Sequence, residues 1–192
     1  MSYLKTIVQA QDYPISLAEV KEYLNVTSDD FDITIQSLID SVTVSCENYC
    51  GISLIQQTKT LYLDCWPESN CIELKRGPII DIVAINIYST TNELTTLDIS
   101  KGITNSDPVN PVFALNDGEK WPDIELRSIE PIQITYRVGF GETPDDIPKS
   151  LSTGMMIELA SLFENRGESE LDTPHLQPET KRLWQSYRPV LL

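Results

Sequence analysis

The sequence predicts an α+β protein in which N- and C-terminal helices pack as a small helical core and an antiparallel β block is inserted between them. Apolar residues recur at three- and four-residue steps before residue 53 and again after Pro148, which is typical of helices with one buried face. Between residues 54 and 138 the apolar period falls to two, in short runs separated by turn residues. A chain of 192 residues suits one domain with an inserted subdomain. We therefore expect residues 1–53 and 139–192 to form the helical core, and residues 54–138 to form the β subdomain.

The first helix is predicted in "PISLAEVKEYLN", which begins with a capping box. Ser16 can cap the helix, while Glu19 can reach back to the Ser16 backbone. Ile15 and Val20 stand where a hydrophobic staple would pack.

A second helix is expected over about Asp30 to Cys50, and Gly51 should end it. Asp29, Asp30 and Asp32 lie at its start, where carboxylates favour the helix dipole. This cluster lacks the glycine and the distal glutamate of an EF-hand loop, so we interpret it as helix capping and not as a calcium site. The expected apolar stripe consists of Phe31, Ile35, Leu38, Val42, Cys46 and Tyr49.

The β block is predicted as an antiparallel meander or small sandwich. Its β-rich runs are "TKTLYLDCW", "CIELK", "IIDIVAINIYS", "ELTTLDI", "PVFAL", "IELRS" and "IQITYRV". The stretch "SKGITNSDPVNP" has no clear period, so we expect an irregular surface loop there.

Two helices are expected after the β block. Pro148 suits the first position of a helix that runs to about Asn165, and Pro178 should begin a last short helix. Leu151, Met155, Leu159 and Leu162 form the stripe of the longer helix. We expect this stripe to pack against the second helix, with Leu38, Val42, Met155 and Leu159 buried.

The loop "GFGETPDD" between the β block and the third helix resembles a phosphate-binding turn only in outline. A P-loop needs a lysine and a hydroxyl residue after the second glycine, and a dinucleotide fingerprint needs a third glycine. Here Glu142, Asp145 and Asp146 would repel a phosphate. We therefore interpret the glycines as a turn out of the strand and predict no cofactor site.

No catalytic or metal site is predicted. The sequence has one histidine, His175, and no G-x-S-x-G elbow, so a hydrolase triad is not expected. The four cysteines lack C-x-x-C spacing, and Cys46 and Cys50 are interpreted as small core residues. No apolar stretch approaches the roughly 20 residues of a membrane span, and no signal peptide is visible. We expect a non-enzymatic protein without a membrane partner that is cytosolic where it is made.

Charge is distributed unevenly along the chain. The net charge is −15, yet residues 176–192 carry +2, so the other 175 residues carry −17. Such an acidic protein should not grip nucleic acid over its general surface. The basic end has two interpretations: a terminal helix that folds back on its own core, or a helix that docks into another subunit. The candidate docking residues are Arg182, Leu183, Trp184, Tyr187 and Arg188.

Taken in order, these segments resemble the head–tail connector, or adaptor (head-completion), proteins of long-tailed phages and gene transfer agents, in the branch with an inserted β region. The resemblance is carried by "ISLAEVKEYLNV", "CENYCGISLIQQT", "CIELKRGPIIDIVAINIY" and "YRVGFGETPDDIPKSLSTGMMIELASLFENRGE". Phe163, Asn165, Arg166 and Gly167 match the aromatic and N/x-R-E/G ending of the family's third helix.

The resemblance implies a structural virion protein at the head–tail interface, assembled in the host bacterial cytoplasm. Such proteins form a homo-oligomeric ring, as twelve copies, beneath the portal protein. They extend the DNA channel and provide a platform for the tail through a tail-side connector or stopper protein. Double-stranded DNA would pass without specific binding, and the C-terminal helix would reach the portal.

An alternative remains a non-enzymatic binding module whose β block recognises a ligand or host component. Aromatic side chains gathered on one β face would favour it, and Tyr62, Tyr88 and Trp121 are the candidates.

Overall fold

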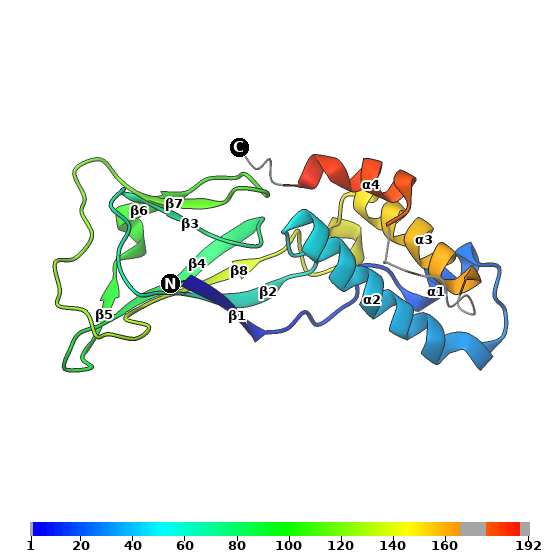
Figure 1. The fold of residues 1–192 in the computed structure, drawn as a ribbon, viewed down its shortest axis with the longest axis horizontal. Coiled ribbons are helices and arrows are strands. Elements are labelled where there is room, and N and C mark those ends of the chain that lie inside the picture. Colours follow the sequence, from blue (N-terminus) through cyan, green and yellow to red (C-terminus); the bar gives the residue numbers. More distant parts are fainter. Residues whose placement is uncertain (1, 166–175, 189–192) are drawn as a thin grey trace.

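The computed structural model describes residues 2–165 and 176–188 of the chain. The molecule is elongated, with the helices gathered at one end and the strands at the other (Figure 1). The helices and 3-10 turns, in chain order, are α1 (Leu17–Tyr23), η1 (Asp29–Phe31), α2 (Asp32–Cys50), η2 (Ile99–Lys101), η3 (Pro144–Asp146), α3 (Lys149–Glu164), α4 (Pro178–Trp184) and η4 (Gln185–Tyr187). The α+β class predicted from the sequence is confirmed.

The predicted helix boundaries are set by the expected capping residues. Ser16 and Glu19 form the capping box of α1, and Gly51 ends α2 in the left-handed conformation, with φ 69°. Pro148 is the N-cap of α3 and not its first residue, so that prediction was wrong by one position.

The helical core forms where α2 meets α3 and α4. Val42, Met155 and Leu159 are fully buried, as predicted. Leu38 is only half-buried, and its neighbour Ile39 is buried instead, so the buried stripe lies slightly to one side of the predicted one. The buried members of this core are Ile15, Val20, Ile35, Ile39, Val42, Cys46, Cys50, Ile52, Leu54, Ile55, Ile147, Leu151, Met155, Leu159 and Trp184.

The β end is a sandwich of two antiparallel sheets. One sheet has the order β1-β2-β8-β4-β5 and the other β3-β7-β6. Their strands are β1 (Ser2–Val8), β2 (Gln57–Leu63), β3 (Cys71–Glu73), β4 (Ile79–Tyr88), β5 (Leu94–Leu97), β6 (Gly102–Thr104), β7 (Val112–Leu115) and β8 (Ile132–Val138). A second buried cluster fills the space between the sheets: Leu61, Ile72, Leu74, Ile85, Ile87, Leu97, Phe113, Leu115, Ile132, Ile134, Tyr136 and Val138.

Three segments of the β end differ from the prediction. Ser2–Val8 forms the edge strand β1 paired with β2, so this part of residues 1–53 does not belong to the helical core. Gly102–Thr104 forms β6 inside the expected irregular loop. The run "IELRS" contributes only an isolated bridge between Ser89 and Leu126. All three are short or at an edge, where the apolar alternation is weak.

Candidate docking surface on the C-terminal helix

The helix α4 lies along α3 and is anchored by Trp184 (Figure 1). The Trp184 side chain is fully buried, and its Nε1 donates to the Leu151 carbonyl at 3.2 Å. Gly154 of α3 makes this approach possible, because a Cβ at that position would overlap the indole ring. Tyr49 of α2 also packs near Trp184, with the two ring centroids 6.0 Å apart.

Polar contacts fix the beginning of α4 to the same face of α3. Thr180 is fully buried, and its hydroxyl donates to the Gly154 carbonyl at 3.2 Å. The Gln177 backbone N–H donates to a carboxylate oxygen of Glu158 at 3.0 Å, and its side-chain amide donates to the Ser161 hydroxyl at 2.7 Å. Glu158 is itself almost fully buried, so this bond satisfies a carboxylate that would otherwise be costly to bury.

Tyr187 and Arg188 extend the contact beyond α4. The Tyr187 and Phe140 rings are nearly perpendicular, with their centroids 6.2 Å apart. The Ser150 hydroxyl donates to the Tyr187 hydroxyl at 3.3 Å. The Arg188 guanidinium lies over the Tyr49 ring, 5.3 Å from its centroid, within the range of a cation–π contact.

The structure therefore corrects one part of the predicted docking set. Trp184 belongs to the helical core of its own chain, which agrees at that residue with the interpretation that the terminal helix folds back on its own core. Leu183 and Tyr187 are half-buried against the same core, whereas Arg182 and Arg188 are exposed. The sequence could not distinguish these roles, because Trp is enriched both in cores and at interfaces.

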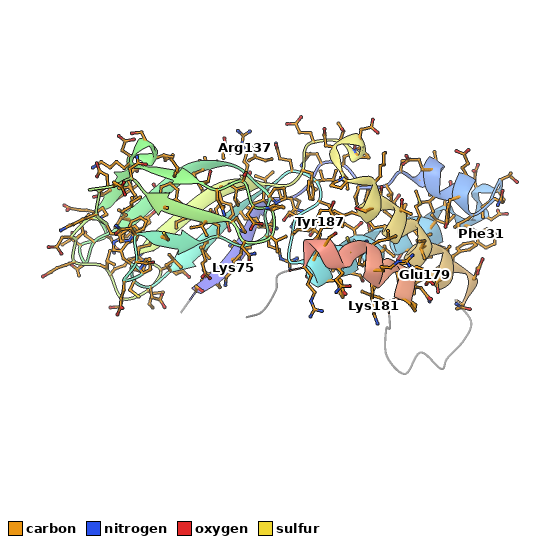
Figure 2. The ribbon with its side chains drawn as sticks, turned by 90° about the horizontal axis from the view of Figure 1, so that it is seen from above. Phe31, Lys75, Arg137, Glu179, Lys181 and Tyr187 are labelled. Atoms are coloured by element: carbon orange, nitrogen blue, oxygen red, sulfur yellow. The ribbon has the colours of Figure 1, made fainter. Side chains whose placement is uncertain are left out.

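The exposed face of α4 is basic. Lys181 and Arg182 project into solvent and form no ion pair with any described carboxylate. Figure 2 shows Glu179 and Lys181 on α4 and Tyr187 in the turn that follows it. A partner that approaches α4 would thus meet the exposed Lys181 and Arg182 together with the acidic Glu179.

The Gly-Phe-Gly loop has the structural role expected from the sequence. A Cβ at Gly139, where φ is 123°, would lie 2.7 Å from the Ile55 backbone. Asp146 folds back so that its carboxylate accepts bonds from the Thr143 backbone N–H and hydroxyl, at 3.0 and 2.9 Å. These bonds lower the pKa of Asp146. A carboxylate thus occupies the turn in which a nucleotide phosphate would have to bind.

Within residues 2–165 and 176–188, no three His, Cys, Asp or Glu side chains are grouped to hold a metal ion. The single histidine, His175, lies outside the described residues. None of the described helices is both long enough and apolar enough to cross a bilayer.

Each aromatic residue proposed for a β-face binding module contacts another side chain of this chain. Tyr62 stacks on Tyr3 at 4.6 Å, and Tyr88 lies beneath the Arg127 guanidinium at 4.1 Å. Trp121 stacks on a second tryptophan at the border of the sandwich core. The strand register places Tyr62 and Tyr88 on the same outer face of the large sheet, whereas Trp121 packs against the sandwich core, so the three do not form one aromatic face.

The family is decided by comparison with known proteins. The model of the head completion protein family matches residues 14–158, which include α1, α2, the whole β block after β1 and most of α3. The chain belongs to this family. It is therefore a structural protein of the virion's head–tail connection and not an enzyme. A comparison with curated protein sequences found no match.

Solved structures of gene transfer agent (GTA) particles contain chains with the same fold. A chain in the neck of the empty GTA particle, computed with C6 symmetry, has a TM-score of 0.83 at 17% identity, and the alignment covers 99% of this chain and 97% of that chain. A chain in the virion of the native GTA particle has a TM-score of 0.81 at 17% identity, with 98% and 96% covered. A chain in the neck of the native GTA particle, computed with C12 symmetry, has a TM-score of 0.81 at 18% identity, with 99% and 97% covered.

Proposed function

We propose that this protein is a head–tail connector that forms a ring beneath the portal, extends the DNA channel and provides the platform for the tail. The match to the head completion family carries the proposal, because it spans both the helical and the β parts of the chain. The likeness to chains of GTA necks computed with C6 and C12 symmetry supports a ring, and we propose twelve copies in the virion.

The charge of the chain suits a channel. A net charge of −15 disfavours adhesion to DNA phosphates. DNA could then pass the ring without being held by it. We propose that the ring assembles in the bacterial cytoplasm, between the portal and a tail-side connector or stopper.

Electron microscopy of purified portal-bearing heads mixed with this protein tests the proposed ring. We expect density for a ring at the portal vertex, and tails should attach only to heads that carry it. Heads that bind no ring, or that join tails equally well without the protein, would show that the connector function is wrong.

We further propose that the exposed part of α4 and of the turn that follows it contacts the portal. Arg182 and Arg188 would pair with portal carboxylates, while Leu183 and Tyr187 border the contact and Trp184 holds the helix in place from within the chain. Charge complementarity of this kind directs docking.

Reversal of both exposed arginines tests the portal contact. Arg182→Glu combined with Arg188→Glu should weaken binding to portal-bearing heads in a sedimentation assay. Lys5→Glu, an exposed site on β1, is the control and should bind as the unmodified protein does. Equal binding of all three proteins would place the portal contact elsewhere.

A further inference from the structure

A cavity with polar and apolar walls lies where the helical and β ends of the molecule meet. It has a volume of about 630 Å³, within the roughly 300–1,000 Å³ of ligand-binding pockets. Its walls come from β1, from the segment between β1 and α1, from α2 and from β2, together with Arg76. A space of this size is much larger than one bound ion needs.

Lys59 on β2 is the unusual group in the wall of this cavity. The residue is 6% exposed. Its ammonium donates to the Thr6 hydroxyl at 3.0 Å and to the Gln57 side-chain oxygen at 2.7 Å, and both acceptors are neutral. An ammonium has three donors, so one donor has no partner among the described residues. Burial lowers the pKa of Lys59, with the nearby Arg76 acting in the same direction and Glu47 opposing it.

Arg76 is the second cation in the wall, and it too is held by neutral groups. Its guanidinium donates to the Glu47 backbone carbonyl and to the Asn48 side-chain oxygen, each at 2.6 Å. The Glu47 carboxylate accepts bonds from the Leu54 backbone N–H at 3.0 Å and from the Gln57 amide at 3.1 Å. Neither cation therefore has a carboxylate partner within ion-pair distance among the described residues.

The inner wall carries one unbalanced positive charge. Lys59 and Arg76 contribute two positive charges and Glu47 one negative charge. Asp12 and Asp40 also border the cavity, but both are exposed, so water and salt screen them. A buried charge without a counter-ion is costly, and one additional carboxylate would neutralise this wall.

We propose that this cavity receives a carboxylate-bearing segment of the neighbouring copy in the ring, with the incoming carboxylate bound by Lys59. This inference rests on the proposed ring and adds the contact that joins one subunit to the next. The cavity has room for a carboxylate, and the chain itself is rich in carboxylates. A second copy of the chain is therefore the partner we propose.

A second copy of this chain fits the cavity better than a free anion does. Each copy carries 29 acidic residues, so almost any segment that a neighbour presents offers a carboxylate. The mouth is also partly apolar, because Val44 and Tyr13 are 57% and 44% exposed. Exposed apolar side chains that lie beside polar ones mark sites of protein contact. A ring requires a contact between two different surfaces of neighbouring copies, which this cavity and an acidic segment provide.

The first test compares Lys59→Met with Lys5→Met during ring formation on purified portal-bearing heads. Both variants lose one positive charge, but Lys5 lies exposed on β1. We expect the full-length Lys59→Met protein to unfold at a temperature no lower than that of the unmodified protein, because methionine removes the buried charge and keeps most of the unbranched side chain. Half-maximal ring formation should nevertheless need at least tenfold more of it, whereas Lys5→Met should match the unmodified protein.

The outcomes distinguish this inference from the function on which it rests. If the unmodified protein forms no ring, the proposed function fails. If it forms rings and Lys59→Met does so at the same concentration, the carboxylate site is wrong.

The second test does not depend on the folding of a Lys59 variant. A photo-cross-linking amino acid at Val44, at the mouth of the cavity, should couple in assembled rings to a peptide of this same chain that contains Asp or Glu. Coupling to a portal protein, a tail protein or DNA, or no coupling in assembled rings, would overturn the proposal. So would a finding that sodium acetate alone raises the melting temperature of the unmodified protein while no cross-link forms.

Discussion

At the residue scale, Gly154 of α3 and Trp184 of α4 determine how closely these two helices approach. The indole of Trp184 occupies the space in which any larger residue at position 154 would place its Cβ. The backbone carbonyl of Gly154 also accepts a hydrogen bond from the Thr180 hydroxyl. A small residue thus permits both an aromatic contact and a hydrogen bond between the helices.

Gly154→Ala should therefore destabilise the protein, although alanine is the better helix former. Overpacking of a filled core costs about 1–3 kcal/mol, while the gain in helix propensity is only about 1 kcal/mol. Urea unfolding followed by circular dichroism measures the difference. Thr153→Ala, at the exposed neighbouring position, is the control. A variant at position 154 as stable as the unmodified protein would mean that Trp184 is not seated against α3.

Lys59 leads to a second prediction at this scale, which concerns pH. Its pKa is lowered in the folded protein, so the unfolded chain binds more protons between that lowered pKa and the ordinary value of about 10.4. Stability should consequently rise with pH in this window. Lys59→Met has no group to titrate there, so the unmodified protein should gain stability relative to the variant as the pH increases toward 10. Thermal unfolding of both proteins from pH 8 to 10 measures this, and parallel curves would contradict the burial of the ammonium.

At the element scale, the helices with complete local signals were predictable and the elements held by distant partners were not. The Ser16–Glu19 capping box and Gly51 fix α1 and α2 through neighbours in the sequence. Strand β1 has no such signal, because its position depends on pairing with β2 more than fifty residues away. The position of α4 against α3 likewise depends on Gly154, and no sequence motif around Gly154 indicates this contact.

The predicted docking residues show the same limit. A short helix begins at Pro178 as expected, but it ends at Trp184, so Tyr187 lies in the following 3-10 turn and Arg188 after it. Their exposure could not be assigned, because it depends on which side of α4 faces α3. The cavity around Lys59 gave no sequence signal at all: Lys59, Glu47 and Arg76 lie on separate segments, and each is an ordinary surface type of residue.

Substitutions on opposite sides of α4 should separate its two roles. Trp184→Ala should cost about 3–5 kcal/mol of unfolding free energy, as a large aromatic side chain leaves a cavity. Arg182→Ala, on the exposed side, should change stability by less than about 0.5 kcal/mol. Denaturant unfolding of the full-length variants measures both. If Trp184→Ala is as stable as Arg182→Ala, α4 is not part of the helical core.

At the scale of the whole molecule, the chain passes between the helical and β ends three times, after β1, after α2 and after β8. The junction is tied by contacts between these passages. Gly139 packs closely on the Ile55 backbone, and Arg76 binds the end of α2. The sequence predicted the two ends through their different apolar periods, but not this junction, whose contacts join residues far apart in the chain.

The net charge of −15 is also a property of the whole molecule, and it predicts that the protein does not bind DNA. Binding to DNA is driven by the release of counterions when basic side chains neutralise phosphates. Basic residues do occur together on α4 and just after it, at Lys181, Arg182 and Arg188, but residues 176–192 carry only +2 and the other 175 residues carry −17. Fluorescence anisotropy should therefore detect no binding of the purified protein to a labelled double-stranded DNA, even at about 50 mM salt, where such binding is strongest. Arg182→Glu combined with Arg188→Glu should give the same result. Binding by the unmodified protein that is lost in this double variant would mean that α4 holds DNA, and the proposal of a channel through which DNA passes freely would be wrong.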